Sequence, residues 1–304
     1  MNMTNTSGDS SSNRIDISAE FLRKLELLNI ISRKVFTGKM RGERRSRKRG
    51  ASVEFADFRE YCWGDDFRYI DWNAFGRLDR LFLKLFVEEE DLFIYFLIDT
   101  SPSMDSGMPN KLLYAKKITA ALGYIALANF DSVCIGSYNS DLRIIQHPAK
   151  GKAKIFRVMD VLNGIASAGL TSPDRAVESF LAQKHRHGMV FVISDMYELD
   201  GLKRALTLLK FNGYDPVAIQ VLSPQEIDPD LKGSLRLMDS ETKKFVEVTV
   251  SGRLMKAYRK RLDSFCGEIG SFCRKNEIGY YRGVTDVPFE DMILRYLRKA
   301  YLVG

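Results

Sequence analysis

The hydrophobic positions of this chain follow two different periods, which together predict alternating strands and helices. Continuous apolar runs at residues 93–98 and 189–194 are typical of strands buried on both faces of a parallel sheet. Shorter apolar runs predict further strands at residues 133–139, 142–147, 214–222 and 278–283. Apolar residues three or four apart predict helices over 18–36, 111–130, 152–166, 173–185, 201–211, 254–276 and near the C-terminus. The order predicts an α/β fold with a doubly wound, mostly parallel sheet.

Composition divides the chain into three expected parts. Residues 1–17 form a polar stretch without the apolar core of a signal peptide, which predicts a disordered tail. Residues 18–91 form an N-terminal accessory segment with a helix and at least one strand, and residues 92–304 form the α/β domain. No apolar stretch approaches the roughly 20 residues that cross a bilayer. We therefore expect no membrane insertion, and the four scattered cysteines favour the reducing cytoplasm.

The net charge of +7 is concentrated in one place, because residues 39–49 hold seven bases and one acid. This basic stretch and the following Gly-Asp-Asp turn are candidate partner-binding positions. They comprise Arg44, Arg45, Arg47, Lys48, Arg49, Asp65 and Asp66. Aromatic residues follow closely, so nucleic-acid binding is the alternative function. The many acids nearby favour instead pairing within the protein or with an acidic protein partner, and we do not expect nucleic acid to be the ligand.

Oxygen-bearing side chains follow the first buried strand at alternate positions, in the pattern Asp99-x-Ser101-x-Ser103. Thr171, just before a helix, and Asp195, directly after residues 189–194, are expected at the same edge of the sheet, where ligands of open α/β sheets bind. Hard cations such as Mg²⁺ or Mn²⁺ favour this ligand set. We predict ligands Asp99, Ser101, Ser103 and Thr171, with Asp195 binding directly or through water and one position left open.

Simpler explanations exist for each of these residues. An aspartate at a strand end often caps the next helix, and serines after a strand are common turn residues. In the run LTSPDRAV, Ser172 is the expected helix cap and Asp174 an acidic first-turn residue, which leaves Thr171 for the metal. Ser172 and Thr171 could exchange these roles, and Asp174 as a metal ligand is the less favoured alternative to its place in the first turn of the helix.

Common enzyme sites do not fit the same residues. An aspartyl phosphatase commonly needs a second acid two residues after its nucleophile, but Ser101 stands there. The chain has no Gly-x-Ser-x-Gly nucleophile elbow. Residues 164–171 have the spacing of a phosphate-binding loop, yet Leu170 replaces its lysine. We therefore predict a binding protein and not an enzyme.

Two resemblances accompany these motifs. The order of elements with Asp99-x-Ser101-x-Ser103, Thr171 and Asp195 resembles a von Willebrand factor A domain with its metal-ion-dependent adhesion site, a Rossmann-like fold. Residues 41–91, from RGERRSRKRG to FVEEED, resemble the signature of the bacterial domain-of-unknown-function 58 proteins. This resemblance implies a cytoplasmic protein whose partner is a MoxR-type AAA+ ATPase, and it implies no particular reaction. We predict an adaptor that couples such an ATPase to unknown client proteins, in complex assembly or chaperone-like remodelling.

The sequence departs from that signature at two positions. Cys62 stands where a proline is expected, which should alter only the rigidity of the turn. Leu170 stands where a second glycine would precede Thr171, so the loop geometry around Thr171 is expected to decide whether the coordination sphere closes.

Overall fold

The computed structural model of the chain describes residues 14–39, 53–88, 92–231, 233–238 and 245–302. Contacts divide the chain into two compact units, which we describe separately. The α/β unit comprises Met1–Val35 and Leu92–Gly304, and the hairpin unit comprises Phe36–Asp91. Helix α1 (Ala19–Lys39), which the sequence analysis grouped with the accessory segment, thus packs over most of its length with the α/β unit. Residues 1–13 of the expected tail and the basic stretch from residue 40 onwards lie outside the described residues.

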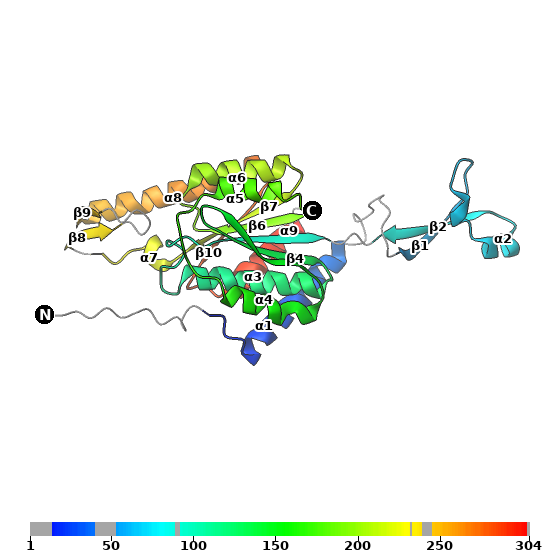
Figure 1. The fold of residues 1–304 in the computed structure, drawn as a ribbon, viewed down its shortest axis with the longest axis horizontal. Helices are drawn as coiled ribbons and strands as arrows, with labels where there is room; N and C mark the ends of the chain where they lie inside the picture. Colours follow the sequence, from blue (N-terminus) through cyan, green and yellow to red (C-terminus); the bar gives the residue numbers. More distant parts are fainter. Residues whose placement is uncertain (1–13, 40–52, 89–91, 232, 239–244, 303–304) are drawn as a thin grey trace. The chain divides into compact units, whose positions relative to one another are not determined.

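The α/β unit is built on a six-stranded sheet in the order β10-β7-β6-β3-β4-β5 (Figure 1). Five strands are parallel, and the edge strand β5 runs antiparallel to β4. The strands are β3 (Phe93–Asp99), β4 (Ser132–Tyr138), β5 (Leu142–Ala149), β6 (Met189–Ser194), β7 (Asp215–Leu222) and β10 (Gly279–Val284). The predicted α/β class and the mostly parallel sheet are confirmed.

Helices cover both faces of this sheet (Figure 1). One face carries α5, α6 and α8, and the other carries α3 with α4 and α9 beside it. The helices are α3 (Lys111–Ala128), α4 (Ile155–Asn163, after the short η2, Lys152–Lys154), α5 (Pro173–Ala182), α6 (Leu199–Phe211), α8 (Gly252–Lys275) and α9 (Phe289–Leu302). Within the described residues, no helix combines the length and the apolar character needed to span a membrane.

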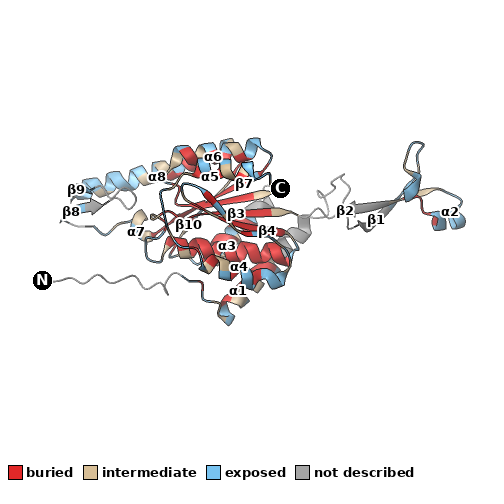
Figure 2. Ribbon diagram, in the orientation of Figure 1, coloured by how far each residue is buried: buried red, intermediate tan, exposed pale blue. Residues whose placement is uncertain are grey.

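The continuously apolar sequence of strand β3 is explained by packing on both of its faces. Tyr95 packs edge-on against Phe180 of α5, with ring centroids 5.0 Å apart, whereas the next residue, Phe96, stacks on Phe191 of β6 at 5.1 Å. Because alternate side chains enter two separate cores, nearly every residue of the strand is buried (Figure 2). Packing on both faces therefore fixes the positions of the residues at the ends of the strand.

Two further elements follow β7. The short helix α7 (Pro224–Ile227) begins directly after the strand end, and the hairpin of β8 (Gly233–Met238) and β9 (Phe245–Val250) precedes α8. A hairpin around Ser240 was predicted, and its two strands are present, while its turn lies outside the described residues.

The hairpin unit pairs β1 (Val53–Glu60) with β2 (Phe82–Glu88) in antiparallel fashion, with a register shift between Phe55 and Asp57. The connection holds a 3-10 turn, η1 (Phe67–Tyr69), and helix α2 (Trp72–Leu78). The carboxylate of Asp71 caps α2 by accepting from the backbone N–H groups of Asn73 and Ala74, and it also pairs with Lys84 of β2. One aspartate therefore fixes the helix on the hairpin.

Packing at the start of β6 yields a first testable prediction. A Cβ added at Gly188 would lie 2.1 Å from the carbonyl oxygen of Phe93, a backbone atom that cannot turn away. We expect Gly188→Ala to lower the free energy of unfolding by about 2 kcal/mol in denaturant titrations. Gly267 of α8 has no atom near its added Cβ, so Gly267→Ala should be neutral or stabilise the protein by up to about 1 kcal/mol. Equal stability of the two variants would contradict this packing.

Candidate metal site at the carboxyl edge of the sheet

The carboxyl ends of the parallel strands meet at one edge of the central sheet. Asp99 is the last residue of β3, Asp195 directly follows β6, and the loop before α5 carries Thr171 to the same place. The structure thus brings together Asp99, Thr171, Ser101 and Ser103, as the sequence predicted, with Asp195 close enough to act on Asp99 electrostatically.

Asp99 is the centre of the hydrogen-bond network. Its side chain is buried, and its Oδ1 accepts from the backbone N–H of Ser101 at 2.9 Å. Its Oδ2 accepts from the hydroxyls of Ser194 at 2.7 Å and Thr171 at 3.2 Å. The Ser101 and Ser103 hydroxyls lie 3.0 Å apart. Hydroxyl oxygens therefore surround one fixed carboxylate.

Thr171 and Ser172 are turned in different directions. The Thr171 hydroxyl reaches Asp99, whereas the Ser172 hydroxyl donates to the carboxylate of Asp174 at 2.8 Å. Ser172 occupies the cap position of α5 but its side chain accepts no helix N–H, so its expected capping bond is absent. Asp174 lies in the first turn, as predicted, and pairs with Arg204 at 2.7 Å. Thr171 is the hydroxyl that faces the site.

Leu170 does not disturb the loop that carries Thr171. The positive φ of +75° falls on Gly169, where an added Cβ would lie 2.9 Å from the Asn139 side chain. The Leu170 side chain is exposed and leaves the backbone free to turn. Ala168 is held on both sides, because its N–H donates to the Thr100 carbonyl and its carbonyl accepts from Asn139. The loop is closed by these bonds without a second glycine.

A buried lysine stands beside the site, which the sequence analysis did not anticipate. The Lys111 ammonium at the start of α3 donates to Asp195 Oδ2 at 2.9 Å and also pairs with Glu226 of α7. It lies 5.3 Å from the centre of the Tyr197 ring. Both Lys111 and Asp195 are buried, so this ion pair works with little screening by water. One oxygen of Asp195 is therefore already engaged by a cation.

Signals for the missed residues are present in the sequence. A lysine at the first position of a helix is unfavourable for the macrodipole, so Lys111 opening an otherwise largely apolar helix marks a special contact. Ser223-x-x-Glu226 forms a capping box, which predicts α7. Ser194 precedes Asp195 as the polar end of an apolar run.

The surroundings of Asp99 change its pKa strongly. Burial, and next the negative charge of Asp195, raise the pKa of Asp99 from 3.8 to about 6, although the Ser194 hydroxyl opposes the shift. A cation between the hydroxyls and the two carboxylates would relieve this repulsion. The oxygen donors fit Mg²⁺ or Mn²⁺, while no group of three or more His, Cys, Asp or Glu side chains suited to a metal occurs in the part of the chain that the structure describes.

The raised pKa of Asp99 predicts a pH dependence in chelator. Between pH 3.8 and about 6 the folded chain keeps the Asp99 proton that the unfolded chain has lost, so this group's stabilisation is complete below pH 3.8 and disappears as pH rises through 6. In denaturant titrations the stability of the wild type relative to Asp99→Asn should fall by about 2 kcal/mol between these pH values. If the stability difference between the wild type and Asp99→Asn stayed constant over this pH range, the pKa of Asp99 would not be raised.

The predicted partner-binding aspartates of the hairpin unit have local roles. Asp65 pairs with Arg59 at 2.8 Å and accepts from the backbone N–H of Cys62, both of which lower its pKa. A proline at position 62 would lack that N–H, so the departure at Cys62 supplies a hydrogen bond. Asp66 caps η1 and binds Arg68. The predicted partner-binding arginines and lysine at positions 44–49 lie outside the described residues.

Three comparisons relate the chain to known proteins, and one of them, a family profile, identifies its family. The chain is 23% identical over 224 residues to uncharacterized proteins of Mycobacterium bovis and Mycobacterium tuberculosis, covering 72% of this chain and 70% of theirs. Among solved structures, a conserved hypothetical protein BatB of Bacteroides thetaiotaomicron has a TM-score of 0.43 at 13% identity, covering 70% of this chain and 100% of that one. The family profile described as "Protein of unknown function DUF58" matches residues 57–264. The chain therefore belongs to the DUF58 family.

Proposed function

We propose that this protein binds a divalent cation, Mg²⁺ or Mn²⁺, at the carboxyl edge of its sheet and docks an acidic side chain of a partner on it. The observation that carries the proposal is the buried Asp99 carboxylate, which accepts from Thr171 and lies beside the paired hydroxyls of Ser101 and Ser103. A protein that supplies few charged ligands leaves coordination positions for water or for a partner's carboxylate. The bound metal supplies an electrostatic bridge.

Each residue has a distinct task in this proposal. Ser101, Ser103 and Thr171 hold the cation through their hydroxyls, and Asp99 supplies the nearest negative charge. Asp195 contributes through water, because Lys111 already holds one of its oxygens. The sheet order, with only β5 antiparallel and helices on both faces, is the arrangement expected of a doubly wound von Willebrand A-like domain, in which such a site serves adhesion.

For the partner we propose a MoxR-type AAA+ ATPase, with the chain as a non-enzymatic cytoplasmic adaptor between that ATPase and client proteins. The family resemblance motivates this choice. The ATPase itself needs Mg²⁺ for its nucleotide, so a chelator alone cannot assign a metal effect to this chain. The test must therefore change Asp99 and keep Mg²⁺ constant.

Capture of a purified MoxR-type ATPase from the same genome tests the proposal. The immobilised wild type should retain the ATPase, and Asp99→Ala should retain about tenfold less or none, a difference of about 1.4 kcal/mol or more. The matched control is Asp174→Ala, because this acid lies in the neighbouring first turn of α5 and pairs with Arg204. Equal capture by all three proteins would contradict the docking role.

A further inference from the structure

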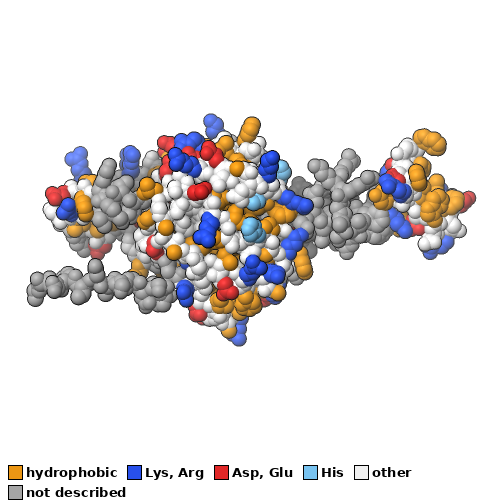
Figure 3. Space-filling view, in the orientation of Figure 1, with side chains coloured by type: hydrophobic (Ala, Val, Ile, Leu, Met, Phe, Trp, Pro, Cys, Tyr) orange, Lys and Arg blue, Asp and Glu red, His pale blue; other side chains and the backbone are white. Residues whose placement is uncertain are grey.

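Several large apolar side chains of the hairpin unit are exposed to solvent. Trp63, Phe67, Trp72 and Leu78 are 99%, 69%, 63% and 61% exposed. Figure 3 shows hydrophobic side chains of this unit gathered around α2, beside basic ones. Exposed aromatic clusters of this kind mark interaction sites, and aromatic and arginine residues are enriched in protein interfaces.

A groove in the same unit is lined in part by one of these residues, Leu78. It has a volume of about 370 Å³, and the described residues that line it belong to the hairpin unit. The rings of Phe58 in β1 and Phe82 in β2 meet edge to face, with centroids 6.3 Å apart, and form one side. Ala74, Arg77 and Leu78 of α2 form the other. The volume is at the small end of ligand pockets and suits one or two side chains of a peptide.

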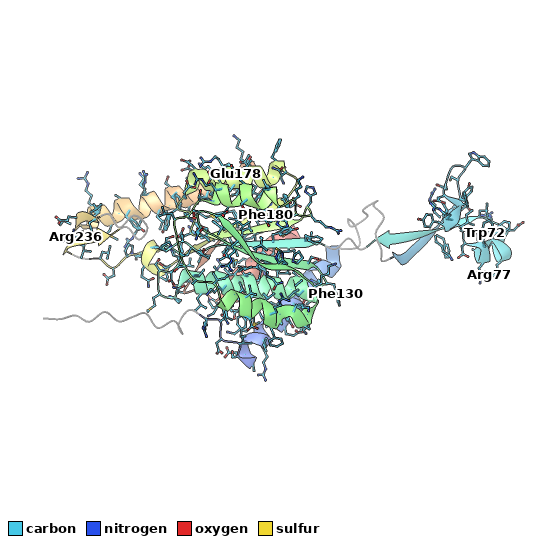
Figure 4. The ribbon with its side chains drawn as sticks, in the orientation of Figure 1. Trp72, Arg77, Phe130, Glu178, Phe180 and Arg236 are labelled. Carbon is cyan, nitrogen blue, oxygen red and sulfur yellow. The ribbon has the colours of Figure 1, made fainter. Side chains whose placement is uncertain are left out.

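The positive charge of Arg77 favours a negatively charged group in whatever binds this groove. The other bases within residues 53–88 each face a carboxylate: Arg59 with Asp65, Arg68 with Asp66, Arg80 with Glu60, and Lys84 with Asp71. The Arg77 Nε donates to the carbonyl of Asn73 at 3.2 Å, and among the described residues no acid pairs with its guanidinium. Figure 4 marks Arg77 with Trp72 on α2. A guanidinium beside an apolar groove is suited to a carboxylate, which it can bind through two parallel hydrogen bonds.

We propose that this groove docks an acidic peptide segment of a partner protein. An apolar anchor side chain of the segment enters between Phe58, Phe82 and Leu78, and an Asp or Glu within about one helical turn of the anchor pairs with Arg77. A nucleic acid fits less well, because phosphate binding relies on several cations and the groove presents one. The proposal does not rest on the metal site, since the described lining residues of the groove belong to the hairpin unit and the proposed metal ligands to the α/β unit.

Selection from a random peptide library displayed on phage tests the proposal, with the intact chain immobilised in a buffer containing chelator. Recovered peptides should share an apolar residue within four positions of an Asp or Glu. A synthetic copy should bind Arg77→Glu and Leu78→Ser about tenfold or more weakly than the wild type. Arg80→Glu, the matched control, lies just beyond α2 outside the groove and should bind normally. Replacing the peptide's acid by lysine should restore binding to Arg77→Glu.

Several results would overturn the proposal. One is a failure to enrich any peptide on the intact chain, which would also be the result if another part of the chain filled the groove. Others are equal binding of the peptide to all variants, or displacement of the peptide by a single-stranded oligonucleotide. A wild-type dimer in sedimentation that Arg77→Glu dissociates would assign the groove to a second copy of the chain instead.

Discussion

Asp99→Ala is expected to weaken Mg²⁺ binding strongly in isothermal titration calorimetry. Asp99 is the carboxylate that meets both the Thr171 hydroxyl and the Ser101 backbone, so its removal takes the principal negative charge from the donor set. We expect an affinity loss of about 100-fold, or nearly 3 kcal/mol. Mg²⁺ should also raise the melting temperature of the wild type and leave that of Asp99→Ala unchanged, because a ligand stabilises only the state that binds it.

Two variants accompany this experiment. Asp174→Ala, whose acid pairs with Arg204 nearby, should bind Mg²⁺ like the wild type. Ser103→Ala leaves the Asp99 carboxylate in place and should weaken binding about tenfold. Melting curves in chelator establish that Asp99→Ala is folded. If the folded Asp99→Ala protein still binds Mg²⁺ with wild-type affinity, the cation lies elsewhere.

Lys111→Met is expected to lower the stability of the metal-free protein and to raise its affinity for Mg²⁺. In chelator it leaves the buried Asp195 without its cation and Glu226 without its partner, which should lower the free energy of unfolding by about 3 kcal/mol. In Mg²⁺ the more negative site should bind the ion about tenfold more tightly, since the ammonium at 2.9 Å from Asp195 no longer repels it. Mg²⁺ should therefore restore part of the lost stability. Calorimetry and denaturant titrations with and without Mg²⁺ measure both effects.

The matched control is the second buried lysine of the same helix. Lys116 donates to the backbone carbonyl of Ile165, and burial lowers its pKa to about 8. Lys116→Met removes a comparable ammonium that does not pair with Asp195, so Mg²⁺ affinity should not rise. A similar gain in both lysine variants would indicate a general effect of net charge and not an exchange at Asp195.

The central sheet was predictable because a strand that is buried on both faces appears in the sequence as an uninterrupted apolar run. Every residue of β3 and β6 before the last one is apolar, since alternate residues enter separate cores. At least one strand was predicted in the accessory segment, and its described residues include two, β1 and β2. Strand β1 shows no such apolar run. Strand β1 mixes acids, a base and aromatics and carries a register shift between Phe55 and Asp57, which breaks the alternation that predicts a strand. Helix α2 spans only two turns and depends on its cap at Asp71.

The candidate site was predictable in part for a related reason. Asp99, Ser101 and Ser103 stand at alternate positions directly after one predicted strand, and Asp195 follows another. The topology of a parallel sheet therefore places all four residues at the same edge. The ion pairs of Lys111 join residues 84 and 115 positions apart and depend on where α3 and α7 begin. The unfavourable place of Lys111 at a helix start marks the lysine, but no local pattern identifies its partners.

Anomalous diffraction from crystals grown with Mn²⁺ is the most direct test of the metal site. We predict a peak at the carboxyl edge of the sheet, bonded at roughly 2 Å to the hydroxyl oxygens of Ser101 and Ser103. Asp195 should keep its bond to Lys111 and contact the ion through water. The absence of a peak beside Asp99, with Thr171 still donating to its carboxylate at saturating Mn²⁺, would contradict a metal-dependent function.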